Sequence, residues 1–379
     1  MKLEDLREKI DVIDDEIAKL YTERMEVARE IGMIKEMEKI NLINTTREKE
    51  IISRVTASMP EDIKLYGKQV YETLFSTSKA YQSRLMSMES ETKTLIENAL
   101  KDGTPAFPID ATVGCQGVPG AYSQIAADRM IEIPNTMFFK DWDAVFNAVE
   151  KGLCKFGVLP IENSSVGSVN SVYDLISQHH CYIVRSAKIR IQHFFLAKKG
   201  TRLEDIKEIF SHEQAIGQCS KFLKQFANAK ITIVNNTAIA AKTVMESDRT
   251  DVACVSSHEC AGIYGLSILE PNIQDNENNY TRFIAISKNL KIFEGANKIS
   301  ITCNLAHEPG SLNKLLNSFS TLGLNLTKLE SRPVANSAFE FNFYFDFDAD
   351  IKRPEVKNLI AELDNTCDRF TFLGAYEEI

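Results

Sequence analysis

The sequence predicts a multidomain protein in which an all-α domain, an α/β domain and an α+β domain follow one another. Three observations predict this class. The chain has 379 residues, more than a single hydrophobic core usually organises. Its first part has helical periodicity, and its middle alternates short β-rich runs with helical segments. Its last part has the order strand, helix, strand, strand, helix, strand. We expect domains at residues 1–90, 111–287 and 298–379, with a polar linker at 91–110 that contains Gly103, Pro105 and Pro108.

Composition limits the function classes. With 44% hydrophobic and 26% charged residues, the chain is typical of a soluble protein. The segment Met1–Lys9 is charged and lacks the apolar run of a signal peptide, so we expect a cytoplasmic protein without membrane contact. The eight cysteines form no C-x-x-C pair, which predicts reduced, structural thiols and no metal site. A net charge of -9 argues against nucleic acid, and an anionic ligand would need locally placed cations.

The first helix carries charges where apolar residues are expected. Arg24 interrupts a heptad seam, and Lys35 follows eleven residues later at nearly the same azimuth. One cation in a seam can snorkel or set the register, but two that look toward one place suggest a site. The seam itself consists of Leu3, Leu6, Ile10, Ile13, Ile17, Leu20, Val27, Ile31 and Ile34.

Two further helices place polar groups on stripes that should be buried. In the third helix the stripe continues into Ser78 and Gln82. A short second helix begins near Thr45 or Thr46, which we expect to be its N-terminal cap, and its first turn carries Arg47 and Glu48. Buried polar groups are costly unless they are paired or bind a ligand, so the pattern predicts a polar pocket for a small anion.

This set resembles the all-helical chorismate mutases over residues 1–85. The resemblance implies a pericyclic rearrangement of chorismate to prephenate without a cofactor. Arg7 and Arg24 would hold the two carboxylates, and Lys35 and Gln82 would face the ether oxygen, where negative charge grows. The remaining implied residues are Glu48 and Ser78, which orient the ring hydroxyl and a carboxylate, Arg47, which supports the cluster, and Asn44, which replaces a family aspartate.

The α/β region resembles the prephenate dehydratases, which implies a two-lobed fold of periplasmic-binding-protein type. The matching stretches are Gly117–Ser123, Gly157–Gly167, Ser211–Ala215 and Asn279–Phe283. The implied reaction removes carboxylate and hydroxyl from prephenate to give phenylpyruvate, with Thr281 as a positioned hydrogen-bond donor or relay. The candidate substrate-binding residues are Ser123, Asn163, Ser164, His212 and Arg282, the last as the local cation.

The C-terminal part predicts a ferredoxin-like βαββαβ unit. Its third strand alternates phenylalanines from Phe339 to Phe347 with polar residues, which predicts one core face and one wet face. Two stretches resemble the phenylalanine-binding motifs of ACT domains, although Ser311-Leu312-Asn313 departs from the usual pattern. The implied effector-binding residues are Pro309, Gly310, Ser311, Leu312, Glu330, Ser331, Arg332 and Pro333.

Two alternatives stay open. The α/β region would suit arogenate as well as prephenate, and a non-enzymatic amino-acid sensor would need two lobes and an ACT domain but neither Thr281 nor the mutase residues. We also expect a homodimer or a dimer of dimers. Arg7 and Arg24 lie roughly 25 Å apart on one helix at 1.5 Å per residue, too far to hold one small molecule. Arg7 would therefore come from a partner chain.

Overall fold

A computed structural model describes residues 3–38, 40, 44–83, 89–305, 308, 310–333 and 341–379. The chain divides into two compact units, one of Met1–Lys101 with Ile299–Phe372 and the other of Asp102–Lys298 with Leu373–Ile379. The last residues of the chain, Leu373–Ile379, join the α/β unit. The predicted classes, helical, two-lobed α/β and C-terminal α+β, are confirmed.

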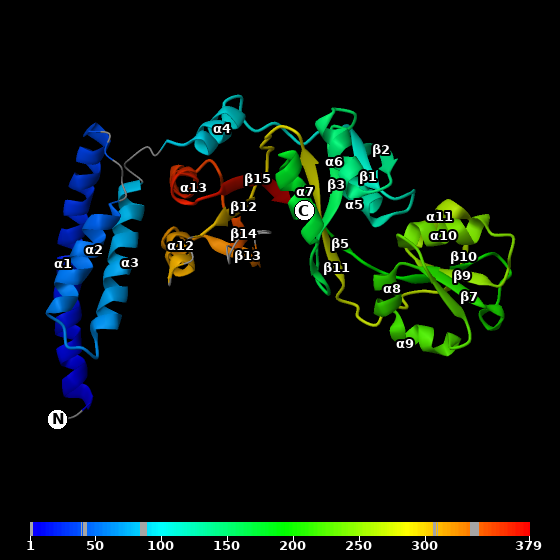
Figure 1. Ribbon diagram of the computed structural model, residues 1–379, viewed down its shortest axis with the longest axis horizontal. Coiled ribbons are helices and arrows are strands. Elements are labelled where there is room, and N and C mark those ends of the chain that lie inside the picture. Colours follow the sequence, from blue (N-terminus) through cyan, green and yellow to red (C-terminus); the bar gives the residue numbers. More distant parts are fainter. Residues whose placement is uncertain are drawn as a thin grey trace. The chain divides into compact units, whose positions relative to one another are not determined.

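The first unit begins with three long helices (Figure 1). They are α1 (Leu3–Glu38), α2 (Thr45–Ala57) and α3 (Lys64–Ser83). Helix α1 buries Ala28 and Gly32, and a Cβ on Gly32 would lie 3.2 Å from Cγ of Gln82 on α3. The predicted heptad seam is not covered in the described chain, where its residues Leu3, Leu6, Ile10, Ile13, Ile17, Leu20, Val27, Ile31 and Ile34 are 40–63% exposed.

The expected linker contains helix α4 (Glu91–Leu100), capped by Ser90. Ile96 is fully buried, and the backbone N–H of Thr92 donates to the Asp364 carboxylate at 3.0 Å. Lys93 lies 3.3 Å from Oδ1 of Asn358. The glycine and prolines that suggested a linker all follow this helix. Helix α4 therefore packs as part of the C-terminal module.

The C-terminal module has the predicted βαββαβ order. Its elements are β12 (Lys298–Asn304), α12 (Ser311–Thr321), β13 (Asn325–Pro333), β14 (Phe341–Asp348), α13 (Pro354–Thr366) and β15 (Phe370–Glu378). Strand β14 buries Phe345 and Phe347 as expected, but its other face is not wet, since Tyr344 and Asp346 are 5% and 3% exposed. Ser300 donates a hydrogen bond to Asp346, which explains how this carboxylate is accommodated. Phe339 and Pro309 lie outside the described residues.

The second unit begins with an α/β lobe whose sheet order is β5-β11-β3-β1-β2, with β4 on β3. Gly114 and Gly157 let α6 approach the sheet, because a Cβ at either position would lie 3.3 Å or less from Val145. Helix α5 packs on the opposite face, where Ala126 and Met130 join the core. The elements are β1 (Asp110–Gln116), α5 (Tyr122–Met130), β2 (Ile133–Phe139), α6 (Trp142–Glu150), β3 (Phe156–Asn163), β4 (Gly167–Ser168), α7 (Asn170–His179), β5 (Tyr182–Arg190) and β11 (Tyr280–Ser287).

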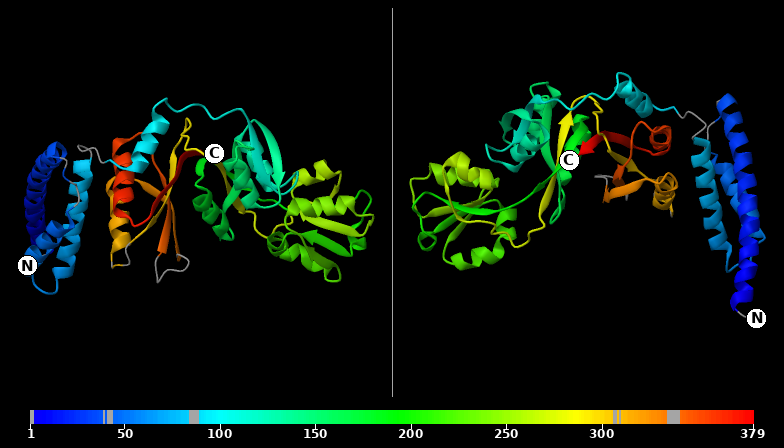
Figure 2. Two further views of the ribbon diagram at one scale, coloured as in Figure 1. Left: turned by 45° about the horizontal axis from the view of Figure 1, so that its top comes forward. Right: turned by 180° about the vertical axis from the view of Figure 1, so that it is seen from behind.

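The other lobe has a five-stranded sheet of order β10-β6-β9-β7-β8, and Figure 2 shows the two lobes as separate layered bodies. Its elements are β6 (Phe194–Ala197), two 3-10 turns (Leu203–Asp205 and Lys224–Phe226), β7 (Glu208–Ser211), α8 (Glu213–Gln218), α9 (Ser220–Leu223), β8 (Lys230–Ile233), α10 (Thr237–Glu246), β9 (Val252–Ser256), α11 (His258–Tyr264) and β10 (Ser267–Glu270).

Three chain segments join the lobes. The β5–β6 and β10–β11 connections lie side by side, and the N–H of Ile273 donates to the carbonyl of His193 at 2.9 Å. The third is the loop between β1 and α5, which reaches into the other lobe. There Ala121 is buried, and Tyr264 donates to the carbonyl of Pro119 at 2.8 Å. The loop between β1 and α5 therefore connects the two lobes through these contacts.

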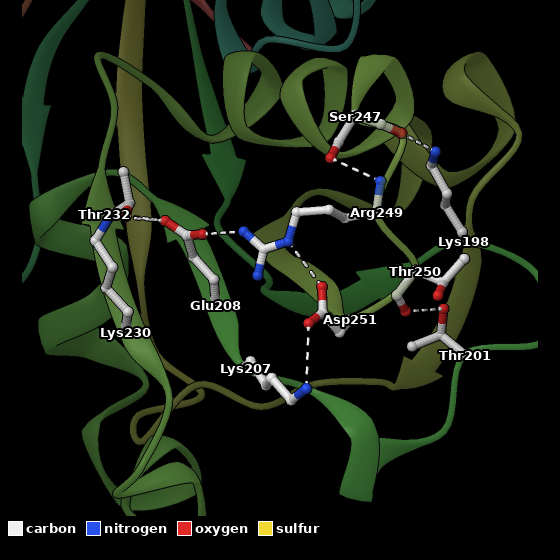
Figure 3. Close-up of polar contacts among 10 residues, drawn as sticks. All are labelled: Lys198, Thr201, Lys207, Glu208, Lys230, Thr232, Ser247, Arg249, Thr250 and Asp251. Atoms are coloured by element: carbon white, nitrogen blue, oxygen red, sulfur yellow. Dashed lines mark hydrogen bonds and ion pairs between the residues drawn. The ribbon is translucent and has the colours of Figure 1, made fainter.

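An ion network lies at the amino ends of β7 and β8 (Figure 3). The Glu208 carboxylate accepts hydrogen bonds from Thr232 and from Arg249, and Lys230 lies 3.1 Å away. These partners, led by Thr232, lower the pKa of Glu208 to about 2. Ligands of parallel sheets bind at the carboxyl ends of the strands, so this network belongs to the structural end of the lobe.

The eight cysteines are free thiols, and all but Cys367 are buried. Among the described helices, none has the length and apolar character needed to cross a membrane.

Candidate active sites

The helical domain brings polar groups of α1 and α3 together. The Arg24 guanidinium donates to the Ser78 hydroxyl and, at 3.2 Å, to the Leu74 carbonyl. It also lies 5.8 Å from the centre of the Phe75 ring. Ser78 is 7% exposed, so this cation is fixed at the edge of a dry helix interface. The predicted convergence of these two helices is present.

Helix α2 adds Glu48, whose carboxylate lies 3.3 Å from Nζ of Lys79. Burial lowers the pKa of Lys35, with Glu48 opposing and Lys79 reinforcing the effect. Because both Glu48 and Lys79 act electrostatically on Lys35, Lys35 lies near the Glu48–Lys79 ion pair. The sequence reasoning missed Lys79, whose position directly after Ser78 on α3 is the available signal.

Four other predicted residues have different surroundings. Gln82 is buried, but its amide donates to the Ala28 carbonyl at 2.7 Å. Arg7 lies beside Glu4, and Arg47 beside Glu50, both on exposed surface. Asn44 caps α2 by accepting a hydrogen bond from the N–H of Arg47 at 3.0 Å, so the predicted cap at Thr45 or Thr46 is wrong. The described chain alone therefore does not bring Arg7 and Arg47 to the cluster.

The second unit contains a cavity of about 460 Å³. Parts of both lobes line it, including the residues that follow β7 and β8 at their carboxyl ends. This is where open α/β sheets usually bind ligands. The lining residues are Gln116, Ala121, Tyr122, Ser123, Trp142, Pro160, Asn163, Val166, Gly167, Ser168, Val169, Ile191, His193, His212, Gln214, Ala215, Gln218, Asn235, Asn236, Thr237, Thr281 and Phe283.

Thr281 and Asn163 face each other in this wall because β11 pairs antiparallel with β3 and sets them opposite one another. Oδ1 of Asn163 accepts from the N–H groups of Ser165 and Val166 at 2.9 and 3.1 Å. Its Nδ2 must therefore point the other way, and it donates to Oδ1 of Asn279 and Oγ1 of Thr281, both at 2.9 Å. Thr281 uses its oxygen as an acceptor here, which leaves its proton for another partner.

The cavity includes two more predicted residues. Ser123 is 6% exposed, and its hydroxyl donates to the Gln116 carbonyl at 2.9 Å. His212 caps α8, accepting through Nδ1 from the N–H of Gln214, and burial lowers its pKa. Both are placed to contact a ligand.

Ser164 and Arg282 are not among the lining residues. Ser164 is exposed and joins β3 to β11, accepting from the N–H of Tyr280 at 3.0 Å. Arg282 follows Thr281 on the strand, so its side chain leaves the opposite face. There its guanidinium lies 3.6 Å from Glu162 and 3.6 Å from Glu378. As a ligand for the substrate, Arg282 is not supported by these contacts.

The lining also contradicts the expected local cations, since within the described chain it includes neither lysine nor arginine, and no aspartate or glutamate. It is rich instead in amides, hydroxyls and imidazoles. Several were missed, among them His193, Gln218 and Asn236. Gln218 lies four residues after Gln214, on the same helix face, which is the signal that was present.

The residues of the ACT-like motifs lie at the start of α12 and along β13. Gly310 precedes α12 with a φ of 87°, a conformation that favours glycine. Ser311 and Leu312 are half-buried in the first turn of α12. On β13, which also carries Ser331 and Pro333, Glu330 lies 3.3 Å from Lys328, and Arg332 lies 5.8 Å from the ring centre of Tyr344.

Comparison with known proteins follows the same division. Residues 113–291 match the prephenate dehydratase family, and residues 6–83 match the chorismate mutase type II family. Arogenate dehydratase/prephenate dehydratase 2 of Arabidopsis thaliana is 36% identical over 70% of this chain and 72% of its own. The bifunctional chorismate mutase/prephenate dehydratase of Escherichia coli K12 is 29% identical over 98% and 95%.

A solved structure covers the same share of the chain, 70%, as the plant relative. Prephenate dehydratase of Arthrobacter aurescens, in complex with L-Phe, superposes with a TM-score of 0.63 at 28% identity, over 70% of this chain and 90% of that one. Together with the two family matches, the chain therefore belongs to the prephenate dehydratase family and, with its N-terminal chorismate mutase domain, is a bifunctional chorismate mutase/prephenate dehydratase of phenylalanine biosynthesis.

Proposed function

We propose that the two reactions use separate sites, one in the helical domain and one in the cavity between the lobes. The observation that carries this proposal is the Asn163–Thr281 hydrogen bond inside a cavity large enough for a small aromatic precursor. The mutase residues belong to the other compact unit. Turnover of the purified chain on chorismate and on prephenate, with prephenate and phenylpyruvate identified as the products, tests that both reactions occur. Variants of Lys35 and Thr281 test that the sites are separate.

In the helical domain Arg24, held by Ser78, binds one carboxylate of chorismate. Lys35 faces the ether oxygen and stabilises the negative charge that grows as the C–O bond breaks. Its lowered pKa reflects a partly desolvated ammonium, whose interaction with that charge is stronger than in water. Glu48 orients the ring hydroxyl, and Gln82 joins the ether oxygen once the substrate displaces its contact with α1.

The mutase is proposed to work as a dimer. The apolar residues of the heptad seam on α1 are 40–63% exposed. A continuous exposed apolar surface of this kind marks a site of association with another protein surface. A second copy that packs on this seam also explains why Arg7 lies on the surface of a single chain. Arg7 of the second copy would then complete the substrate site of the first.

In the cavity, Thr281 donates its hydroxyl proton to the departing hydroxyl of prephenate. The electrons of the bond to the ring carboxylate enter the ring, the C–O bond breaks, and carbon dioxide and water leave with uptake of one proton. Aromatisation drives the reaction. Asn163 fixes the direction of the Thr281 proton, and Ser123 and His212 contact the substrate from neighbouring walls.

Feedback inhibition by phenylalanine is proposed at the start of α12 and along β13, around Gly310 and Arg332. The Arthrobacter aurescens relative is described in complex with L-Phe, which supports an effector of this chemistry. Relatives named for arogenate support arogenate as a second substrate. Parallel kinetics on prephenate and arogenate would establish the preference. A cytoplasmic location is part of the same proposal.

A further inference from the structure

Thr281 and Arg282 are neighbours on β11, and their side chains point to opposite faces of the sheet. Thr281 lines the cavity, whereas Arg282 does not. Arg282 is nevertheless only 7% exposed, and a buried guanidinium is costly unless carboxylates accompany it. The groups that hold Arg282 therefore also bear on the position of Thr281.

A row of charged side chains lies directly behind the cavity wall. In the sheet, Arg282 is opposite Glu162 of β3 and Lys188 of β5. Residues opposite one another on antiparallel strands share a face of the sheet. On the other face Thr281, which precedes Arg282, is opposite Asn163, which follows Glu162. The charged row and the Asn163–Thr281 pair are thus back to back, and a shift of β11 moves both.

The pairing of β11 with β3 is irregular at this point. Arg282 is opposite Glu162 but Phe283 is opposite Pro160, so Ile161 has no counterpart on β11. Pro160 also has no N–H group to contribute to the ladder. A bulge of this kind redirects nearby side chains and interrupts the regular hydrogen bonds. The side-chain contacts of Arg282 therefore help to fix the register of β11 here.

The carboxylate of Glu378 reaches Arg282 from a further strand. Glu378 lies on β15, opposite Ser186 of β5, and its Oε2 is 3.6 Å from Nη1 of Arg282. The same carboxylate lies 2.8 Å from Nζ of Lys188 and 3.4 Å from Nζ of Lys298, and the Ser186 hydroxyl donates to it at 3.3 Å. Because Arg282 and Lys298 are 7% and 5% exposed, Glu378 is an acidic group that two buried cations share.

We propose that Glu378 is a positioning residue of the dehydratase, which acts through Arg282 to hold β11 in the register that sets Thr281 opposite Asn163. This role rests on the proposed function of Thr281 as the proton donor. Glu378 is not among the residues that line the cavity, so it would affect the reaction through this register and not by contact with the substrate. Strand β15 of the C-terminal module would then contribute to dehydration.

Glu378→Gln tests this role, because it removes the charge with little change in size. We expect kcat for dehydration of prephenate to fall roughly tenfold, since a small displacement of a catalytic group lowers the rate strongly. KM should stay within about twofold of wild type, because no lining residue is changed. Glu378→Asp keeps the charge on a shorter side chain and should recover part of the lost kcat.

Glu377→Gln is the matched control. It removes an ion pair of 2.8 Å with Arg185 from the same strand, and kcat should keep its wild-type value. If Glu378 acts through Arg282, the double variant of Glu378→Gln and Arg282→Gln should be no slower than Arg282→Gln alone. Losses that multiply, a rise in KM without a fall in kcat, or equal kcat in Glu378→Gln and Glu377→Gln would overturn the proposal. If Glu378→Gln does not fold in thermal unfolding, Glu378→Asp is compared with Glu377→Gln by the same criteria.

Thr281→Ala in the same assay separates a failure of the positioning role from a failure of the proposed function. If Thr281→Ala loses dehydratase activity while Glu378→Gln keeps the wild-type kcat, Glu378 is not a positioning residue and the assignment of Thr281 stands. If Thr281→Ala stays active, the assignment of Thr281 itself fails, and the positioning role of Glu378 fails with it.

Discussion

The amide nitrogen of Asn163 donates a hydrogen bond of 2.9 Å to the hydroxyl oxygen of Thr281. Two backbone N–H groups hold the other end of the amide, so this direction is fixed by the loop after β3. The hydroxyl proton of Thr281 is thereby turned away from Asn163 and is available to a substrate.

Asn163→Asp reverses this hydrogen bond, because a carboxylate accepts the Thr281 proton. We expect kcat for dehydration to fall by roughly a hundredfold, the usual effect of losing one positioned proton donor. Ser165→Ala is the matched control, since the backbone N–H that holds Asn163 is kept. Wild-type kcat in Asn163→Asp would show that the direction of the Thr281 proton is irrelevant.

The dimeric mutase predicts complementation between inactive chains. Arg7→Ala and Arg24→Ala should each lose mutase activity, because each removes one carboxylate ligand from every site. Mixed dimers contain some sites with both arginines, so activity should return after the two variants are unfolded and refolded together. Heterodimers verified by differential tagging that remain inactive would contradict a site shared between chains.

Much of this organisation follows from sequence pattern, and the exceptions have physical reasons. Strands and helices of the C-terminal module were predictable because their periodicity is local. Helix α4 was not, since it packs against α13, which is far away in sequence, and Ile96 is buried in the fold. Arg282 follows Thr281 in the sequence but lies on the other face of β11, because successive side chains of a strand point to opposite faces. His193 and Asn236 line the cavity because of how the connections after β5 and β8 run in the fold, and no local sequence pattern predicts this.

Stability of the second lobe should depend on Glu208 at acidic pH. The pKa of Glu208 in the folded state is lowered to about 2, from an unfolded value of 4.5. Its contribution to the free energy of unfolding is therefore fully present above pH 4.5 and is lost as the pH falls through 2. Glu208→Gln should reduce the free energy of unfolding by about 2 kcal/mol near neutral pH, the magnitude of a charged hydrogen bond. The difference from wild type should vanish toward pH 2 in urea titrations. A constant difference across this range would assign the effect to packing.

His179 makes the opposite pH prediction. Burial lowers its pKa, but hydrogen bonds to Glu150 and Asp143 outweigh burial, so the net pKa is raised. The contribution of His179 to the free energy of unfolding is full below the unfolded pKa of 6.5 and is lost as the pH rises through the folded pKa. The stability advantage of wild type over His179→Gln should therefore shrink as pH rises from 6 toward 9, as thermal unfolding would show. An advantage that grows with pH would contradict the charge pair.

Phenylalanine inhibition should respond to changes at the start of α12. Gly310→Val forces a side chain into a φ of 87° and should raise the phenylalanine concentration for half-inhibition of the dehydratase by roughly tenfold. Gly323→Ala is a matched control, because it also has a positive φ, 67°, but lies at the other end of the helix. Equal inhibition in both variants would place the effector elsewhere.

Deletion of the residues after Leu290, which would remove the effector motifs, is a poor test of the same point. Residues 373–379 belong to the α/β unit, where β15 pairs with β5. Glu377 lies 2.8 Å from Arg185, and Glu378 lies 2.8 Å from Lys188. Truncation would remove these contacts along with the effector motifs.

The central claim is that one chain carries two independent active sites, and reciprocal variants measure it most directly. Lys35→Ala should abolish conversion of chorismate while dehydration of supplied prephenate stays within about twofold of wild type, because Lys35 interacts with Glu48 in a different compact unit from Thr281. Thr281→Ala should do the reverse. If either substitution silenced both reactions in a protein with a normal unfolding transition, the two-site account would be contradicted.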